Sequence, residues 1–268
     1  MDAVYLDVDG TLLGPRGQFL RGEDGAWSLQ GARALEACDR AGVEVVLMSG
    51  RGRLVLGEDA RLIGQTSFIM EAGACVVLEG EEHWLTAPFL PGTQTVHEQL
   101  SATGAPELLL AHFAGRLEYH DPWHLNRQVS HLFRGRIDAF EADDVLAAHG
   151  HDALRLIDNG PVRDGTARAY HLVPKGVSKA AGVAFHQRAR GYDPAACLAV
   201  GDSREDLAVA PHVGAFWLVG NAVRKDPTIR EALAGVRNAR LAEAGHGAGV
   251  YEAVITTLAE RRAPGARA

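Results

Sequence analysis

The chain has 268 residues, enough for one large domain or for a core with a smaller inserted one. Its 34 acidic and 27 basic side chains give a net charge of −7, which offers no general attraction for nucleic acids or anionic membranes. The N-terminus has no basic segment followed by an apolar stretch, and no run approaches the ~18 apolar residues needed to cross a membrane.

Cysteine usage indicates a reducing compartment. Cys38, Cys75 and Cys197 are odd in number, far apart and surrounded by apolar residues. We therefore expect buried free thiols rather than disulfides or a zinc site, and a cytoplasmic location.

The first predicted element is a buried strand that ends in two carboxylates. Val4, Leu6 and Val8 supply the apolar content of this strand, and Asp7 and Asp9 stand at its carboxyl end, where open α/β sheets bind ligands. Both side chains would point the same way if Asp9 were still extended. Like charges so close repel one another unless a cation or a proton lies between them. The pair therefore indicates a divalent-metal site, an acid–base pair, or both.

Helix and strand signals alternate through the first third of the chain. Residues 29–42 are amphipathic and end at Gly42, which predicts a helix, and the apolar run 43–48 predicts a strand buried on both faces. Shorter strands are expected at 67–70 and 75–78. This succession predicts a parallel sheet with right-handed crossovers.

Residues 81–174 differ in texture and carry nine of the twelve histidines. The expected helices lie near 94–103 and 141–149, and the expected strands near 129–133, 153–157 and 170–173. This mixture predicts a small α+β insertion. Pro122 lies between His120 and His124 and disfavours the helical spacing of a zinc-binding pair.

The α/β alternation resumes after residue 175. A helix is expected at 177–190, strands at 197–200 and 216–219, and a closing helix at 248–261. The sequence therefore predicts an α/β fold with a Rossmann-like parallel sheet and one inserted α+β domain.

Two short motifs suit phosphate binding. Ser49-Gly50-Arg51 follows the strand 43–48, and a hydroxyl with a backbone N–H at a strand end suits a phosphoryl oxygen, although a plain turn is the alternative. Ser178 would cap the helix that follows it. Lys179 would lie in the first turn, where the helix dipole disfavours a cation unless an anion or carboxylates are near.

A second pair of carboxylates follows the strand 197–200. Asp202 lies in the turn and Asp206 four residues later, on the opening turn of a helix, so both can face one point. With Asp7 and Asp9 they make an oxygen-rich site suited to Mg²⁺. A calcium loop is the alternative for residues 7–13, but Thr11, Leu12 and Leu13 cannot supply its further ligands.

Asp7-Val8-Asp9-Gly10-Thr11, Ser49, Lys179 and Gly201–Asp206 resemble, in order, the four motifs of the haloacid dehalogenase (HAD) superfamily. The resemblance implies a Mg²⁺-dependent phosphomonoesterase that hydrolyses a small phosphorylated metabolite, a sugar phosphate or a phosphoglycerate-type compound. It implies an aspartyl-phosphate formed on Asp7 and acid–base catalysis by Asp9. The implied catalytic residues also include Ser49 and Lys179, which with the Gly50 N–H hold the phosphoryl oxygens, and Gly50 and Arg51 are implied to bind substrate. The implied metal-site residues are Asp7, Asp9, Asp202 and Asp206.

The long interval between Ser49 and Lys179 places a cap domain there. It implies a HAD core at 1–80 and 175–268 and a cap at 81–174, similar to Cof-like, mannosyl-3-phosphoglycerate and sucrose-phosphate phosphatases. Three further residues are substrate-binding candidates on this resemblance: Asn221, Arg127 and Arg134. Either arginine could hold a substrate carboxylate, or both could be ordinary surface residues. The sequence departs from the family at Ala72 and Glu205, where Asn is usual.

Two other functions remain open. A phosphomutase or phosphotransferase acting on sugar phosphates would use the same nucleophile. A non-catalytic receiver-type switch would also gather acidic residues and a lysine at strand ends, but receivers are much shorter and have no cap. The expected partner is a small phosphorylated metabolite, with no nucleic acid or membrane.

Overall fold

The computed structural model describes residues 1–162 and 165–262. The chain divides into two compact units. One consists of Met1–Ser49 with Val183–Ala268, and the other of Gly50–Gly182. Helix α6 (Lys179–Arg190) begins in the second unit and ends in the first.

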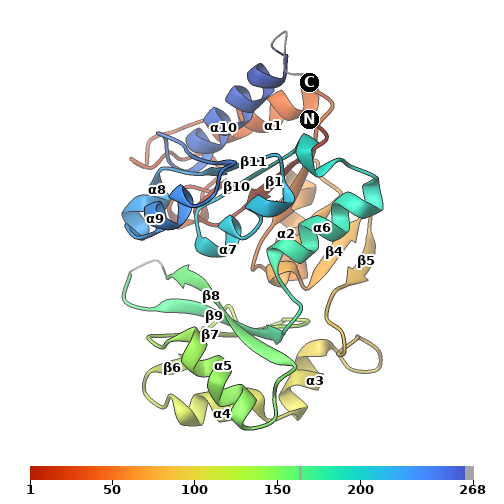
Figure 1. Ribbon diagram of the computed structural model, residues 1–268, viewed down its shortest axis with the longest axis vertical. Coiled ribbons are helices and arrows are strands. Elements are labelled where there is room, and N and C mark those ends of the chain that lie inside the picture. The colour runs from red at the N-terminus through yellow and green to blue at the C-terminus, as the bar shows by residue number, and fades with distance from the viewer. Residues whose placement is uncertain (163–164, 263–268) are drawn as a thin grey trace. The chain divides into compact units, whose positions relative to one another are not determined.

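The first unit is built on parallel strands in the order β12-β11-β10-β1-β2 (Figure 1). The strands are β1 (Ala3–Asp7), β2 (Glu44–Met48), β10 (Cys197–Gly201), β11 (Ala215–Leu218) and β12 (Ala239–Leu241). Helices α1 (Gln30–Arg40) and α10 (His246–Arg262) lie side by side. Three shorter helices are α7 (Arg204–Leu207), α8 (Asn221–Lys225) and α9 (Ile229–Ala234).

Strand β1 lies between β2 and β10, and all its residues are buried. Its register pairs Asp7 with Met48 of β2 and Leu6 with Val200 of β10. Since the three strands are parallel, their carboxyl ends lie at one edge of the sheet, where the loops that follow them meet.

The second unit contains a run of short elements and a separate antiparallel sheet. The run comprises α2 (Arg53–Leu62), β3 (Phe68–Met70), the 3₁₀ turn η2 (Glu71–Gly73), β4 (Cys75–Leu78) and β5 (Glu81–Trp84). The separate sheet has the order β6-β7-β9-β8. Its strands are β6 (Leu117–Tyr119), β7 (His131–Gly135), β8 (Leu154–Pro161) and β9 (Arg168–Pro174).

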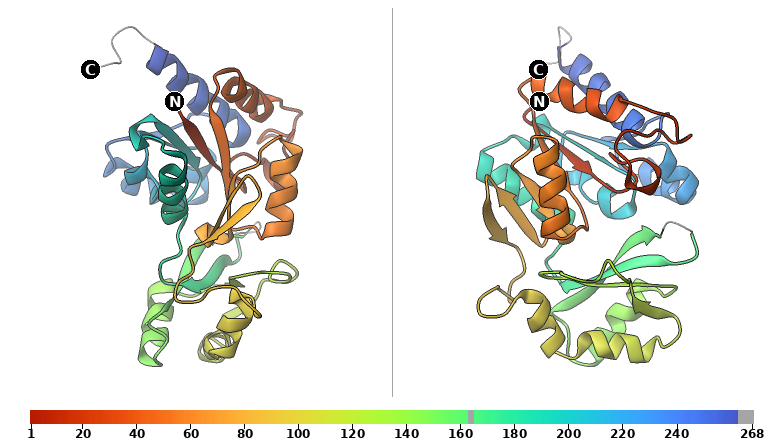
Figure 2. Two further views of the ribbon diagram at one scale, coloured as in Figure 1. Left: turned by 90° about the vertical axis from the view of Figure 1, so that its right-hand side faces the viewer. Right: turned by 180° about the vertical axis from the view of Figure 1, so that it is seen from behind.

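Helices cover one face of this second sheet (Figure 2). They are α3 (Val96–Ala102), α4 (Ala105–His112) and α5 (Ala139–Ala148). Phe113, Phe133 and Tyr170 are fully buried in the core between helices and strands. This part is α+β, as the sequence predicts for residues 81–174.

The predicted α/β fold is confirmed, and the helix and strand bounds differ from prediction by only a few residues for most elements. The strands predicted at 67–70 and 75–78 exist but pair antiparallel, which corrects the all-parallel sheet. Residues 71–74 are too few for the crossover that parallel strands require. The helix predicted from 177 begins at Lys179. The elements β5, β6, β12, α2, α4, α8 and α9 were not predicted.

The expected thiol state is confirmed, since Cys38, Cys75 and Cys197 are free and buried. Within residues 1–162 and 165–262, no helix has both the length and the apolar character that a membrane crossing needs. The predicted core and cap bounds at residues 80 and 174 stay a prediction.

Candidate active site

Three buried carboxylates gather at one edge of the first unit's sheet. Asp7 ends β1, Asp202 follows β10, and Asp206 lies on α7. One oxygen from each lies within 4.8 Å of the others. The parallel pairing of β1 with β10 brings Asp7 and Asp202 together, so the sequence argument from strand ends holds for these residues.

Asp206 also fixes the loop that carries Asp202. Its Oδ2 accepts hydrogen bonds from the backbone N–H groups of Asp202 (3.1 Å) and Ser203 (3.0 Å) and from the Ser203 hydroxyl (2.6 Å). Ser203 Oγ accepts in turn from the Asp206 N–H, which completes a capping box. A Cβ on Gly201 would lie 2.2 Å from Cβ of Asp206, so glycine is needed where this loop folds back.

Lys225 of α8 provides a positive charge beside the cluster. Its Nζ donates to Asp202 Oδ2 at 2.6 Å. Burial opposes the charged form, but attraction by Asp202, Asp7 and Asp206 outweighs it and raises the pKa of Lys225. The ammonium therefore offsets part of the negative charge of the three aspartates.

Gly10 allows the loop after β1 to approach this ion pair. Its φ is +89°, and a Cβ there would lie 2.3 Å from Asp202 Oδ2 and 3.2 Å from Lys225 Nζ. A side chain at position 10 would therefore be strained in its backbone and would displace Asp202.

The donor set fits a hard divalent cation. Buried carboxylates without compensating charge are costly, and carboxylate oxygens are the protein ligands that Mg²⁺ prefers. Among the side chains of residues 1–162 and 165–262, the three aspartates form the one group of three or more potential ligands gathered in this way. Asp7, Asp202 and Asp206 would hold the ion.

Asp9 and Ser49 follow the neighbouring strands β1 and β2. Because β1 ends at Asp7, Asp9 is not in an extended strand, and the condition under which both carboxylates share a strand face is not met. Asp9 is exposed and forms an isolated bridge with Leu13. Ser49 directly follows β2 and is buried.

Asn221 connects two loops of the first unit. Its Nδ2 donates to the Gly10 carbonyl and its Oδ1 accepts from the His246 N–H, both at 2.8 Å. The side chain thereby stabilises the loop after β1. Its predicted contact with substrate stays a prediction.

Lys179 opens α6 in the second unit and is buried. Ser178 Oγ accepts from the Ala181 N–H at 3.0 Å, so the predicted helix cap is confirmed. Gly73 supports this helix end, because a Cβ there would lie 1.9 Å from the Ser178 carbonyl oxygen.

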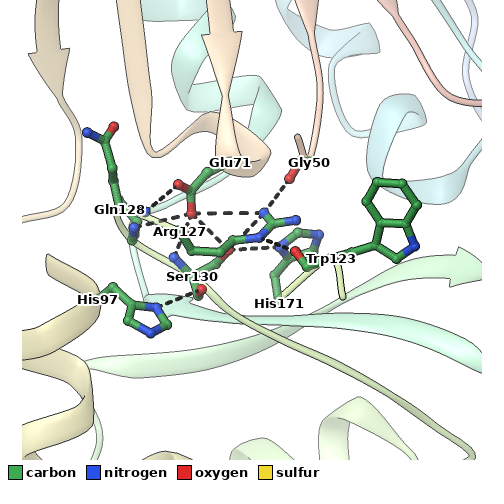
Figure 3. Close-up of polar contacts among 9 residues, drawn as sticks. Gly50, Glu71, His97, Trp123, Arg127, Gln128, Ser130 and His171 are labelled. Atoms are coloured by element: carbon green, nitrogen blue, oxygen red, sulfur yellow. Dashed lines mark hydrogen bonds and ion pairs between the residues drawn. The ribbon is translucent and has the colours of Figure 1, made fainter. Parts of the chain in front are cut away.

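The second unit also contains a buried polar cluster around Glu71 (Figure 3). Glu71 is fully buried, and its carboxylate accepts from the N–H groups of Gln128 (2.8 Å), Val129 (3.2 Å) and Ser130 (2.7 Å). The Ser130 hydroxyl also donates to it, at 2.9 Å. One carboxylate thus fixes the backbone of three consecutive residues.

Arg127 lies in this cluster rather than at the surface. Its Nη1 donates to the Gly50 carbonyl at 2.6 Å, its Nε donates to the Trp123 carbonyl at 3.1 Å, and only 8% of its side chain is exposed. Nη1 is 4.0 Å from Glu71 Oε2. The structure therefore excludes the ordinary surface arginine that the sequence left open for Arg127.

The other two arginine candidates have acidic partners. Arg51 pairs with Asp59 of α2 at 2.6 Å. Arg134 pairs with Glu118 of β6 at 2.7 Å and is half exposed. These ion pairs do not test the predicted contacts of Arg51 and Arg134 with substrate, which stay predictions.

The chain was compared with family models, with curated proteins and with solved structures. No protein-family model matches the sequence. The chain is 28% identical to a phosphoglycolate phosphatase from Methanoculleus marisnigri over 257 residues, 95% of each chain.

Two solved structures share the fold. Sucrose-phosphatase from Synechocystis has a TM-score of 0.65 and 14% identity, over 95% of this chain and 97% of that one. A haloacid dehalogenase-like hydrolase from Bacteroides thetaiotaomicron has a TM-score of 0.63 and 17% identity, over 96% and 99%.

The chain thus has the fold of these HAD-type structures and is similar over 95% of its length to a phosphoglycolate phosphatase. Sequence reasoning found the three aspartates of the cluster but missed the roles of Lys225 and Glu71. Lys225 follows Asn221 by one helical turn, and Glu71 directly precedes Ala72, where the sequence departs from the family pattern. Neither position carries a local pattern that reveals its distant contacts.

Proposed function

We propose that the protein is a Mg²⁺-dependent phosphomonoesterase of the HAD superfamily whose substrate is a small phosphorylated carboxylic acid, with phosphoglycolate the first candidate. The observation that carries the proposal is the buried cluster of Asp7, Asp202 and Asp206 at the ends of β1 and β10. The similarity to a phosphoglycolate phosphatase over 95% of both chains supports the substrate class.

Asp7 is the proposed nucleophile. Its carboxylate attacks phosphorus, an O–P bond forms, and the bond from phosphorus to the leaving oxygen breaks. Asp9 gives its proton to that oxygen. In the second step Asp9 takes a proton from water, whose oxygen attacks the aspartyl-phosphate and releases inorganic phosphate.

Other residues of the chain are proposed to hold the phosphoryl group. Ser49 offers a hydroxyl at the end of β2, the Gly50 N–H follows it, and Lys179 offers an ammonium. Bound Mg²⁺ would offset the repulsion between the Asp7 carboxylate and the phosphate. Most of the rate gain would then come from positioning and electrostatics.

The finer placement of the chain is also proposed. The long interval between Ser49 and Lys179 supports the Cof-like or mannosyl-3-phosphoglycerate phosphatase-like branch, with residues 81–174 as the cap. The free buried thiols support the cytoplasm as the location.

The experiment is phosphate release from a panel of metabolites, with Mg²⁺ and with EDTA. The panel contains 2-phosphoglycolate, the phosphoglycerates and hexose phosphates, and the proteins are the native chain, Asp7→Asn and Asp9→Asn. We expect release that needs Mg²⁺, vanishes in Asp7→Asn and falls about 10²–10⁴-fold in Asp9→Asn.

The same panel separates the competing functions. A sugar bisphosphate formed without free phosphate would identify a phosphomutase. A stable aspartyl-phosphate without turnover would identify a switch. Normal turnover in Asp9→Asn would remove Asp9 from the mechanism.

A further inference from the structure

The backbone that follows Ser49 is held from several sides. The Gly50 carbonyl accepts from Arg127 Nη1 at 2.6 Å, and the Arg51 carbonyl accepts from the Glu71 N–H at 3.0 Å. A Cβ on Gly50 would lie 2.8 Å from His171 Nε2. Two consecutive carbonyls are therefore fixed by distant residues, and the Gly50 α-carbon, which precedes both, faces the His171 imidazole.

Arg127 is itself rigid. Its Nε donates to Trp123 and its Nη1 also reaches Ser130 Oγ at 3.3 Å, so the planar guanidinium is bound along two edges (Figure 3). Burial lowers the pKa of Arg127 and the Glu71 carboxylate opposes this, but an arginine stays protonated. The hydrogen bonds thus fix the orientation of the charged guanidinium, and Glu71 is its counter-ion.

Glu71 is held in an unfavourable backbone conformation. Its φ is +47° and that of Ala72 is +60°, a region that non-glycine residues rarely adopt. Such conformations persist where the surroundings impose them and are frequent near functional sites. Here the hydrogen bonds from residues 128–130 to the Glu71 carboxylate impose it.

The cluster also fixes His171. The Ser130 hydroxyl gives its one proton to Glu71, so the 3.1 Å contact between Ser130 Oγ and His171 Nδ1 requires Nδ1 to be the donor. Burial, then Arg127, Lys179 and His120, hold the pKa of His171 well below its usual range. The imidazole that packs on Gly50 is therefore neutral, and Arg127 carries the charge.

We propose that Arg127 is a positioning residue of the phosphatase, which fixes the backbone after Ser49 through the Gly50 carbonyl. A peptide group is planar and trans, so a fixed Gly50 carbonyl also fixes the direction of the Arg51 N–H. The Arg51 N–H, which follows the Gly50 N–H, is then aimed before the phosphoryl group arrives. The inference rests on the proposed function and deepens it, because it assigns Arg127 to the protein backbone rather than to a substrate carboxylate.

The test compares Arg127→Gln, Arg127→Lys and the native chain on two substrates. One is 2-phosphoglycolate, which has a carboxylate, and the other is p-nitrophenyl phosphate, which has none. Arg61→Gln is the matched control, since Arg61 lies exposed on α2 and pairs with Glu58. Thermal unfolding verifies that each variant is folded, and Ser130→Ala perturbs the same cluster by a smaller change.

We expect Arg127→Gln to lower kcat roughly tenfold to a hundredfold, the range for losing a charge-assisted hydrogen bond, and equally for both substrates. Arg127→Lys should recover part of this loss, because a lysine ammonium can reach the Gly50 carbonyl but cannot bind the Gly50 and Trp123 carbonyls together. The Kd of inorganic phosphate should rise in the same order of variants. Ser130→Ala should show a smaller loss of the same kind.

Three results would overturn the proposal. A loss confined to 2-phosphoglycolate would make Arg127 a ligand of the substrate carboxylate. Native kinetics in folded Arg127→Gln and Ser130→Ala would show that the clamp has no role in the reaction. A rise in KM with kcat unchanged would place Arg127 in binding alone.

Amide hydrogen exchange separates this proposal from the proposed function. We expect faster exchange of the amides of residues 50–52 in Arg127→Gln than in Arg61→Gln. If the native chain hydrolyses no phosphate ester, the proposed function fails, while faster exchange still shows that Arg127 positions this backbone. Unchanged exchange in an active native enzyme would reject the positioning role alone.

Discussion

Lys225 changes the net charge of the proposed metal site formed by the three aspartates. The Lys225 ammonium lies 2.6 Å from Asp202 Oδ2 and brings positive charge to the cluster. A divalent cation would bring its own compensation to the same carboxylates. The Lys225 ammonium and a bound cation would therefore compete to neutralise the Asp202 carboxylate.

Lys225→Met should destabilise the metal-free protein by about 1 kcal/mol, a modest value because the lysine side chain is partly exposed. The gain in melting temperature on adding Mg²⁺ should be larger than in the native chain, because the competing charge is gone. Thermal unfolding with Mg²⁺ and with EDTA measures both, and Lys175→Met serves as a control on an exposed lysine. A smaller Mg²⁺ gain would instead mean that Lys225 holds Asp202 in place for the ion.

Gly10 carries a second prediction at this scale. Gly10→Ala should destabilise the protein and weaken Mg²⁺ binding, because its Cβ would lie 2.3 Å from Asp202 Oδ2. Gly25→Ala is a matched control, since Gly25 also has a positive φ but nothing within 4 Å of its Cβ position. Gly25→Ala should lower the free energy of unfolding by only about 1 kcal/mol, the cost of placing alanine at a positive φ. Titration calorimetry measures the Mg²⁺ affinity of each variant. Equal losses of affinity in Gly10→Ala and Gly25→Ala would contradict a specific role for Gly10 beside Asp202.

Between elements, histidines connect α3, β6 and β7 in the second unit. The rings of His97 and His131 stack with centroids 3.9 Å apart, and His131 Nδ1 lies 3.2 Å from the Tyr119 hydroxyl. Burial, and then His97, lower the pKa of His131 to about 4. The packing of these elements therefore requires a neutral imidazole.

This shift makes stability depend on pH in a definite direction. Between about pH 6.5 and 4 the unfolded chain binds a proton at His131 that the folded chain does not, so stability falls as pH falls through this range. The loss from this residue is on the order of 3 kcal/mol. Urea unfolding at several pH values should show a flatter dependence in His131→Gln than in the native chain.

His149→Gln, which changes an exposed histidine at the end of α5, serves as the control for that series. A native pH slope retained in His131→Gln would mean that other buried histidines, such as His171, account for the acid lability.

At the scale of the whole molecule, the aspartate cluster belongs to one unit. Mg²⁺ should therefore slow amide exchange at the ends of β1 and β10 and in α7, and leave the β6-β7-β9-β8 sheet unchanged. Mass spectrometry of exchange, with Mg²⁺ and after EDTA, measures this by peptide. Equal protection of both units would show that the ion acts on more than its own site.

Much of this organisation could be predicted from the sequence, because buried strands are apolar runs. The runs at 3–8, 43–48 and 197–200 predicted β1, β2 and β10, and strand ends then located Asp7 and Asp202. Strand β5 has the sequence Glu-Glu-His-Trp and shows no such run. The antiparallel pairing of β3 with β4 could have been predicted from the four residues between them.

The missed site residues depend on contacts that no local pattern encodes. Lys225 reaches Asp202 across 23 positions, and Glu71 reaches Ser130 across 59. For Arg127 the sequence left a substrate ligand and a surface residue open, because its partners in the structure include backbone carbonyls, which every residue carries. Side chains that bind backbone leave no complementary residue to find in the sequence.

The position of β1 between β2 and β10 has a consequence for how the protein is made. Asp7 leaves the ribosome about 200 residues before Asp206, so at 5–20 residues per second roughly 10–40 s separate the two ends of the cluster. During this time β1 can pair with β2, but its other edge has no strand to pair with. A nascent chain therefore keeps an apolar strand edge open until its last third is translated, and the metal ligands come together only then.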